Sequence, residues 1–176
     1  MANLIRNCRV EADSWQRLEL GAAPNETAGA LPPVPADGDV IVPLALWQAR
    51  RDALAARNGR TGVWLDSKDG PESIAADLAR LPLIAINFPS IADGRGLSTA
   101  RLLRERHGYT GEIRAIGTVI KDLLLGMQRC GFDSFLLRDD QDPADALLAF
   151  GELADAYQAS AVEKQPLFRR RLAGAR

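Results

Sequence analysis

The chain has 176 residues, which is enough for one domain with a sizeable core and short for two. Its net charge of -1 gives no electrostatic reason to expect nucleic acid or an anionic membrane as a partner. No apolar run approaches the roughly 20 residues that cross a bilayer, and the first residues lack the apolar stretch of a signal peptide. We therefore expect a cytoplasmic protein with neither nucleic acid nor membrane among its partners.

Residues 3–20 predict a small strand pair that turns at Glu11–Ser14. Residues 21–38 are rich in alanine, proline and glycine, which is typical of a loose linker or surface loop. A repeated strand–helix pattern begins at Asp39. The chain is thus predicted to divide into an N-terminal strand pair with its linker (1–38), an α/β domain (39–158) and a basic C-terminal tail (159–176).

Short apolar strands alternate with helices through the central domain. The strands are predicted at 40–42, 63–65, 83–88, 113–116 and 134–137, and the helices at 44–57, 71–81, 97–107, 119–130 and 143–157. The strands are apolar almost throughout, which favours a parallel sheet covered by helices. The fold class is therefore α/β, with about five mainly parallel strands. Right-handed crossovers leave two architectures, an open doubly wound sheet or a curled, partial (β/α)-barrel-like sheet with helices on one side.

The loop after the predicted strand at 83–88 is the strongest candidate for a binding site, because ligands of α/β proteins bind at the carboxyl ends of strands. Its two glycines allow the backbone to approach a ligand closely. Free N–H groups at a helix start, together with two guanidinium groups, favour an anion such as phosphate, sulfate or carboxylate. The candidate residues are Asp93, Arg95, Gly96, Ser98 and Arg101. In the alternative interpretation this segment is a tight turn, capped by its own side chains.

Other parts of the same edge are less specific. Lys121, at the start of the next helix, can meet an anion held by Arg95 or can belong to a solvated face. The glycine spacing after Asp93 resembles the dinucleotide-binding pattern G-x-G-x-x-G but fails it, because Thr99 replaces the third glycine. The segment Asp66–Gly70 offers carboxylates for Mg²⁺ but is more typical of a turn. No residue set identifies a catalytic group.

Cysteine and histidine are too few for common metal centres. Cys8 and Cys130 are the only thiols, and His107 is the only imidazole. An iron–sulfur cluster or a structural zinc site needs about four such ligands, so we expect neither from this chain alone. His107 ends a helix at the edge opposite the candidate site, which excludes a Ser-His-Asp triad.

Two further features concern charge. Arg114 interrupts an apolar strand, so if it is buried it needs a partner, for which Asp133 or Asp93 can serve. The tail carries several basic residues after Glu163. We expect it to be disordered alone and able to dock on an acidic partner, with Leu167 and Phe168 as an apolar anchor.

Three marks together carry a family resemblance: VIVPLALW, the block DGRG-S-ARLLRER-GY-GE-RA-G, and RCGFDSF. Over about residues 39–157 the chain resembles the bacterial domain-of-unknown-function 934 family. Its members are commonly labelled as uncharacterised oxidoreductases involved in sulfite reduction, from genes beside assimilatory sulfite reductase. No catalytic residues of the family can be carried over. In one departure, Lys121 and Leu123 stand where the family pattern has Arg and Gln.

The resemblance implies a place in sulfur assimilation, and the residues select among roles there. Sulfite reduction depends on haem, iron–sulfur or flavin centres. The chain lacks the thiols for an iron–sulfur cluster, and it also lacks a nucleotide-binding motif. We therefore expect an accessory protein of assimilatory sulfate/sulfite reduction, which binds a small oxyanion or sulfur metabolite beside the sulfite reductase haemoprotein. The alternatives are an oxidoreductase with a nonstandard flavin or NADPH site, and an interaction module that uses the basic tail.

Overall fold

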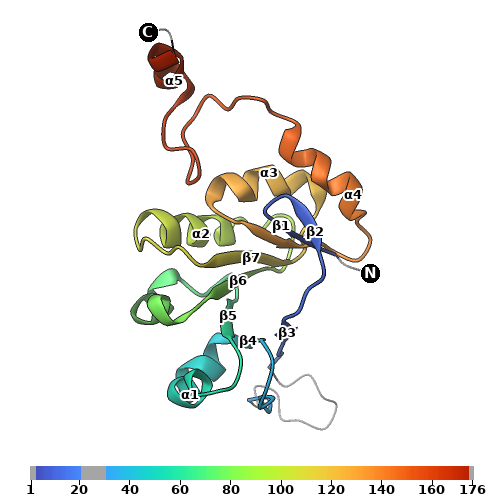
Figure 1. Cartoon of the computed structure of the whole chain (residues 1–176), viewed down its shortest axis with the longest axis vertical. Helices are drawn as coiled ribbons and strands as arrows, with labels where there is room; N and C mark the ends of the chain where they lie inside the picture. Colours follow the sequence, from blue (N-terminus) through green and yellow to red (C-terminus); the bar gives the residue numbers. More distant parts are fainter. Residues whose placement is uncertain (1–2, 21–30, 175–176) are drawn as a thin grey trace.

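The computed structural model describes residues 3–20 and 31–174 (Figure 1). Its strands are β1 (Leu4–Arg6), β2 (Arg9–Glu11), β3 (Gln16–Arg17), β4 (Val40–Pro43), β5 (Thr61–Leu65), β6 (Leu83–Phe88), β7 (Glu112–Gly117) and β8 (Ser134–Leu136). Its helices are α1 (Leu44–Ala55), the 3₁₀ helix η1 (Pro71–Arg80), α2 (Arg95–Glu105), α3 (Lys121–Cys130), α4 (Pro143–Ala146), the 3₁₀ helix η2 (Leu147–Gly151) and α5 (Leu167–Gly174). Within the predicted linker, residues 21–30 lie outside the described residues.

The described strands form one sheet in the order β2-β1-β8-β7-β6-β5-β4-β3. From β3 to β8 neighbouring strands are parallel, and β1 and β2 continue the sheet as an antiparallel pair beside β8. Each parallel strand lies next to its chain neighbour, so successive right-handed crossovers place the helices on one face. The sheet is open and curled (Figure 1). The predicted α/β fold is confirmed, and the structure selects the curled architecture over the doubly wound one.

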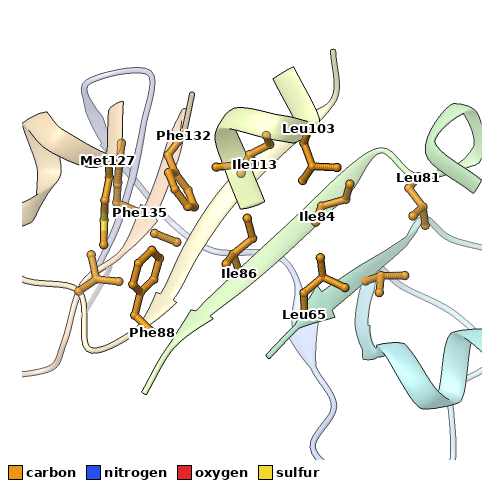
Figure 2. Close-up of a cluster of buried hydrophobic side chains, with 14 of the residues drawn as sticks. Leu65, Leu81, Ile84, Ile86, Phe88, Leu103, Ile113, Met127, Phe132 and Phe135 are labelled. Carbon is orange, nitrogen blue, oxygen red and sulfur yellow. The ribbon is translucent and has the colours of Figure 1, made fainter. Parts of the chain in front are cut away.

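The main core lies between the sheet and the helices that cover it. In β6 the side chains of Ile84, Ile86 and Phe88 point toward this core, and Leu103 packs on them from α2 (Figure 2). Phe88 continues into an aromatic row with Phe132, at a ring-centroid distance of 5.7 Å. Fully burying one such side chain stabilises the fold by about 1.5–3 kcal/mol, which explains why the strands are apolar.

The N-terminal segment, residues 12–20, covers the other face of the sheet. Trp15 is buried there against a second apolar cluster that includes Leu83 and Ala85 of β6. Trp64 of β5 donates its indole N–H to the carbonyl of Leu18 at 2.9 Å. Both faces of the central strands are therefore largely covered, and the N-terminal segment is an integral part of the sheet's packing.

Three local predictions are wrong. The N-terminal strand pair turns at Asn7 and Cys8, whose positive φ values of 49° and 58° suit a two-residue hairpin turn, and not at Glu11–Ser14. The helix predicted at 143–157 ends at Gly151. The basic tail, expected to be disordered, forms α5, which is composed mostly of strong helix formers. Within the described residues no helix is long and apolar enough to cross a bilayer.

Candidate functional site

The Asp93–Gly96 loop lies at the carboxyl edge of the sheet, as predicted, and its charges are paired with each other. Asp93 accepts hydrogen bonds from Arg95 at the backbone N (3.2 Å), Nε (2.9 Å) and Nη2 (2.7 Å). Arg95 Nη2 also donates to the hydroxyl of Ser67, after β5, at 2.9 Å. The Arg95 hydrogen bonds hold the pKa of Asp93 well below its usual range. Asp93 and Arg95 therefore form an ion pair within the loop after β6, and the hydrogen bond to Ser67 ties this loop to the end of β5.

The remaining residues predicted at this site serve α2 itself. Gly96 is buried, and a Cβ added there would lie 2.8 Å from the Phe88 ring and 2.9 Å from the Ile86 side chain. It therefore permits α2 to approach the sheet closely. Ser98 is exposed on α2, and Arg101 donates to Glu105, one turn on, at 3.0 Å.

Lys121 belongs to another set of contacts. Its Nζ lies 2.9 Å from Asp145 Oδ1, and that hydrogen bond raises the pKa of the ammonium group. Its backbone N–H donates to Gln141 Oε1 at 3.0 Å. Lys121 therefore ties the start of α3 to the segment after β8, whereas Arg95 is tied to the end of β5.

The Asp66–Gly70 segment forms a turn at the same edge. The backbone N–H of Asp66 donates to Asp69 Oδ2 at 2.9 Å, and Asp66 Oδ1 accepts from Asn87 Nδ2 at 3.2 Å. Through Ser67 this turn connects the Asp93–Arg95 pair to the end of β6. Among the described residues, no group of three or more His, Cys, Asp or Glu side chains is placed to hold a metal ion.

A hollow of about 610 Å³ opens at the carboxyl ends of β7 and β8, under the N-terminal segment. Arg17 and Asp13 line it from that segment, and Gly117, Arg138 and Asp139 line it from the strand ends. Gly117 has a φ of 88°, so a side chain there would be strained. This hollow lies at the carboxyl edge of the sheet, where ligands of α/β proteins are expected.

Arg17 also lines a smaller adjoining hollow of about 210 Å³ with Asn87 and Trp64. Its Nε lies 2.7 Å from Glu19 Oε1, and Arg138 pairs with Asp140. Arg138 directly follows the strand predicted at 134–137, so the sequence was enough to place it at the carboxyl edge. The sequence did not place Arg17 there, because Arg17 reaches this edge only through the pairing of β3 with β4.

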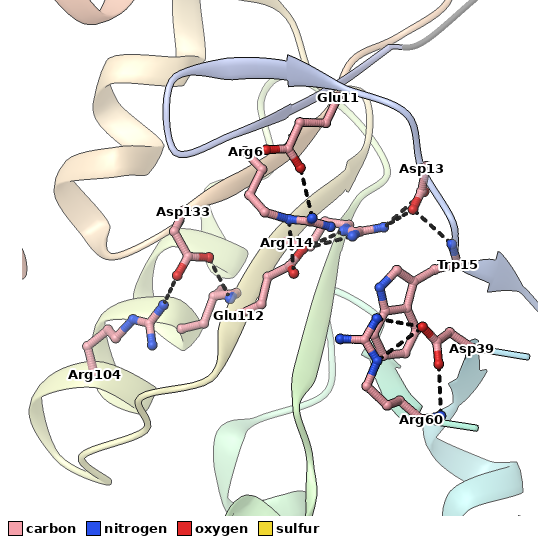
Figure 3. A network of polar contacts seen from close by, with 11 residues as sticks. Arg6, Glu11, Asp13, Trp15, Asp39, Arg60, Arg104, Glu112, Arg114 and Asp133 are labelled. Carbon is pink, nitrogen blue, oxygen red and sulfur yellow. Dashed lines mark hydrogen bonds and ion pairs between the residues drawn. The ribbon is translucent and has the colours of Figure 1, made fainter. Parts of the chain in front are cut away.

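Arg114 corrects a prediction about its partner. Its side chain is fully buried, and it pairs with Asp13 and Glu112, not with Asp133 or Asp93 (Figure 3). Asp133 instead accepts from Arg104 at 2.8 Å, although burial raises the pKa of its carboxyl group. Arg114 thus holds the N-terminal segment, and with it one wall of the 610 Å³ hollow, against the sheet.

Comparison with known proteins identifies the family. No curated protein and no solved structure matches the chain. The model of a family described as bacterial protein of unknown function (DUF934) matches residues 62–168, more than half of the chain. The matched range includes the DGRG and RCGFDSF segments, which carry the resemblance in sequence. The chain belongs to the DUF934 family.

Proposed function

We propose that this protein binds a small oxyanion at the carboxyl edge of its sheet and acts as an accessory protein of assimilatory sulfate/sulfite reduction, beside the sulfite reductase haemoprotein. One observation carries the binding part: two arginines, Arg17 and Arg138, line one hollow of about 610 Å³. A guanidinium group matches the planar, bidentate geometry of oxyanions. The pathway part is supported by the family resemblance of the sequence.

The bonds that each arginine already makes favour this hollow over the Asp93–Arg95 loop. An anion that binds an arginine competes with the acid already paired with it. Glu19 and Asp140 have side chains 45% and 58% exposed, so a displaced carboxylate returns to water at little cost. Arg95 donates three side-chain hydrogen bonds, two to Asp93 and one to Ser67, so an anion has more internal bonds to replace there.

Binding can be measured by calorimetry and thermal shift with sulfite, sulfate and phosphate. Arg17→Ala and Arg138→Ala are each expected to weaken binding about tenfold, the loss of one charge-assisted hydrogen bond. Arg106→Ala is the matched control, because Arg106 is an arginine at the opposite end of the parallel strands, between α2 and β7, and its contact with Glu72 is 3.9 Å long. Equal losses in all three variants would mean nonspecific charge attraction.

Two further measurements decide between the two candidate anion sites, and between an accessory protein and an oxidoreductase. If Arg95→Ala alone abolishes anion binding, the site is the Asp93–Arg95 loop and the proposed hollow is wrong. If FMN or NADPH binds and the oxyanions do not, the protein is an oxidoreductase with a nonstandard cofactor site. Co-purification with the sulfite reductase haemoprotein, and loss of sulfite reductase activity on deletion, are expected of an accessory protein; neither result would occur for an unrelated one.

A further inference from the structure

Exposed apolar side chains gather in the C-terminal part of the chain. Of the nine large apolar side chains that are exposed among the described residues, six lie between residues 148 and 172: Leu148, Leu153, Tyr157, Val162, Phe168 and Leu172. Single exposed apolar residues are normal on a protein surface, whereas a contiguous apolar patch marks an interaction site. This part of the chain therefore has the composition of an interface.

Helix α5 carries one half of such an interface. It projects from the body at the end farthest from α1 (Figure 1). Phe168 and Leu172 are one turn apart and so share a helix face, and both are exposed. Arg169 and Arg171 flank them, and residues 164–174 contain no acid. Helix α5 thus presents an apolar stripe framed by positive charge.

The complementary half lies on the segment from Asp139 to Asp155, called here the acidic face. This segment contains six acids and no lysine or arginine: Asp139, Asp140, Asp142, Asp145, Glu152 and Asp155. Leu148 and Leu153 are exposed within it. Beside it lies a hollow of about 220 Å³, whose apolar lining includes Leu125, Phe150, Leu153 and Val162; Arg129 and the chain's own Arg170 also line it. Asp140, Asp145 and Asp155 pair with Arg138, Lys121 and Arg170 of the same chain. Asp139, Asp142 and Glu152 have no ion pair among the described residues, so the acidic face keeps negative charge beside its apolar side chains.

We propose that the protein forms a homodimer in which α5 of each copy docks on the acidic face of the other. The two surfaces are opposite in charge, and both expose apolar side chains, so each supplies what the other lacks. Within one chain the two are joined through Arg170, whose Nη1 lies 3.2 Å from Asp155 Oδ1. Phe168 and Leu172 stay exposed in that arrangement, which leaves them for a second copy. In a dimer with two-fold symmetry, α5 of each copy contacts the acidic face of the other, so both surfaces of both copies are covered.

The oligomeric state tests this directly, by sedimentation velocity or by size exclusion with light scattering. The full chain at about 100 μM is expected to be a dimer that dissociates as salt rises, because part of the attraction is screened. The double variant Phe168→Asp/Leu172→Asp is expected to be monomeric and folded, with a far-UV circular dichroism spectrum like that of the native chain. Ile91→Asp is the matched control, since Ile91 is exposed in the loop after β6. A monomeric native chain, or a dimer that survives the α5 substitutions, overturns the proposal.

A mixing experiment tests which surfaces meet. A second variant, Leu148→Arg/Leu153→Arg, disrupts the acidic face and is expected to be monomeric alone. Mixed with the α5 variant, it is expected to form a heterodimer, because its intact α5 can dock on the partner's intact acidic face. One contact replaces two, so the heterodimer is weaker than the native dimer. If no heterodimer forms although the native chain is a dimer, α5 does not contact the acidic face and the proposal is wrong.

Discussion

Arg114 in β7 and Asp13 in the N-terminal segment are 101 residues apart in sequence, yet Arg114 Nη1 donates to both carboxylate oxygens of Asp13 at 2.9 Å (Figure 3). Arg114 is fully buried and is also bonded to Glu112. A buried guanidinium group is tolerated only where acids surround it. This pair therefore fixes the N-terminal segment on the sheet and shapes one wall of the proposed anion site.

Replacing Asp13 should show how much the stability of the fold depends on the acidic partners of the buried Arg114. Asp13→Ala leaves Arg114 buried with Glu112 as its remaining acid, so we expect the free energy of unfolding to fall by about 2–3 kcal/mol. Urea denaturation measures this change. The control is Asp52→Ala, because the Asp52 side chain is 96% exposed and its contact with Arg80 is 3.5 Å long. Its loss should stay below about 0.5 kcal/mol. Equal losses would mean that the Asp13 pair adds nothing.

Gly96 and Gly126 both lie in helices, but only Gly96 is packed closely against other side chains. Gly96→Ala places a methyl group 2.8 Å from the Phe88 ring, and we expect a loss of about 1–3 kcal/mol in the free energy of unfolding. Gly126→Ala, inside α3, meets no atom within 4 Å and should gain up to about 1 kcal/mol from helix propensity. Thermal and urea unfolding measure both. A neutral Gly96→Ala would show that α2 is not held tightly against the sheet.

Asp39 makes a pH-dependent contribution to stability. Its hydrogen bond from Arg60 lowers its pKa below the ordinary 3.8, and Arg60 also lies over the Trp15 ring (Figure 3). Because the folded pKa is the lower one, the stabilisation is present above the unfolded pKa and is lost as the pH falls through the folded pKa. We expect Asp39→Asn to be less stable than the native chain near neutral pH.

Urea denaturation at several pH values checks this expectation. The stability difference between the native chain and Asp39→Asn should shrink as the pH falls from about 6 to about 3. A difference that stays constant over that range would mean that the charge of Asp39 has no part in it.

The two thiols should differ in reactivity. Cys8 is exposed, whereas Cys130 is partly covered and its burial raises the pKa of its thiol. Because the thiolate is the reacting form, we expect Cys130 to react with a disulfide reagent at least about tenfold more slowly than Cys8 in the folded chain. The variant Cys8→Ser isolates the slow phase. Unfolding in urea should make the rates of the two thiols similar; a fast Cys130 in the folded chain would contradict this assignment.

Local pattern was enough to locate the central elements. The run from Leu83 to Phe88 is apolar because both of its faces are covered, and it forms β6 over those same residues. Pro143, with the Asp142 carboxylate as a cap, starts α4. Gly131 ends α3 with a φ of 108°. Each of these signals acts within a few residues, so one sequence shows it.

By itself, then, the sequence determined the strand–helix alternation, the parallel sheet and the carboxyl edge as the place to look. Tertiary structure alone decided the strand order, which places the helices on one face of the sheet. It also decided which acids pair with Arg114 and that Arg17 lies at the carboxyl edge. The physical reason is the range of the interactions. Periodicity and capping depend on neighbours along the chain, whereas strand order and ion pairing depend on which distant segments gain most by covering each other's apolar surface and buried charge.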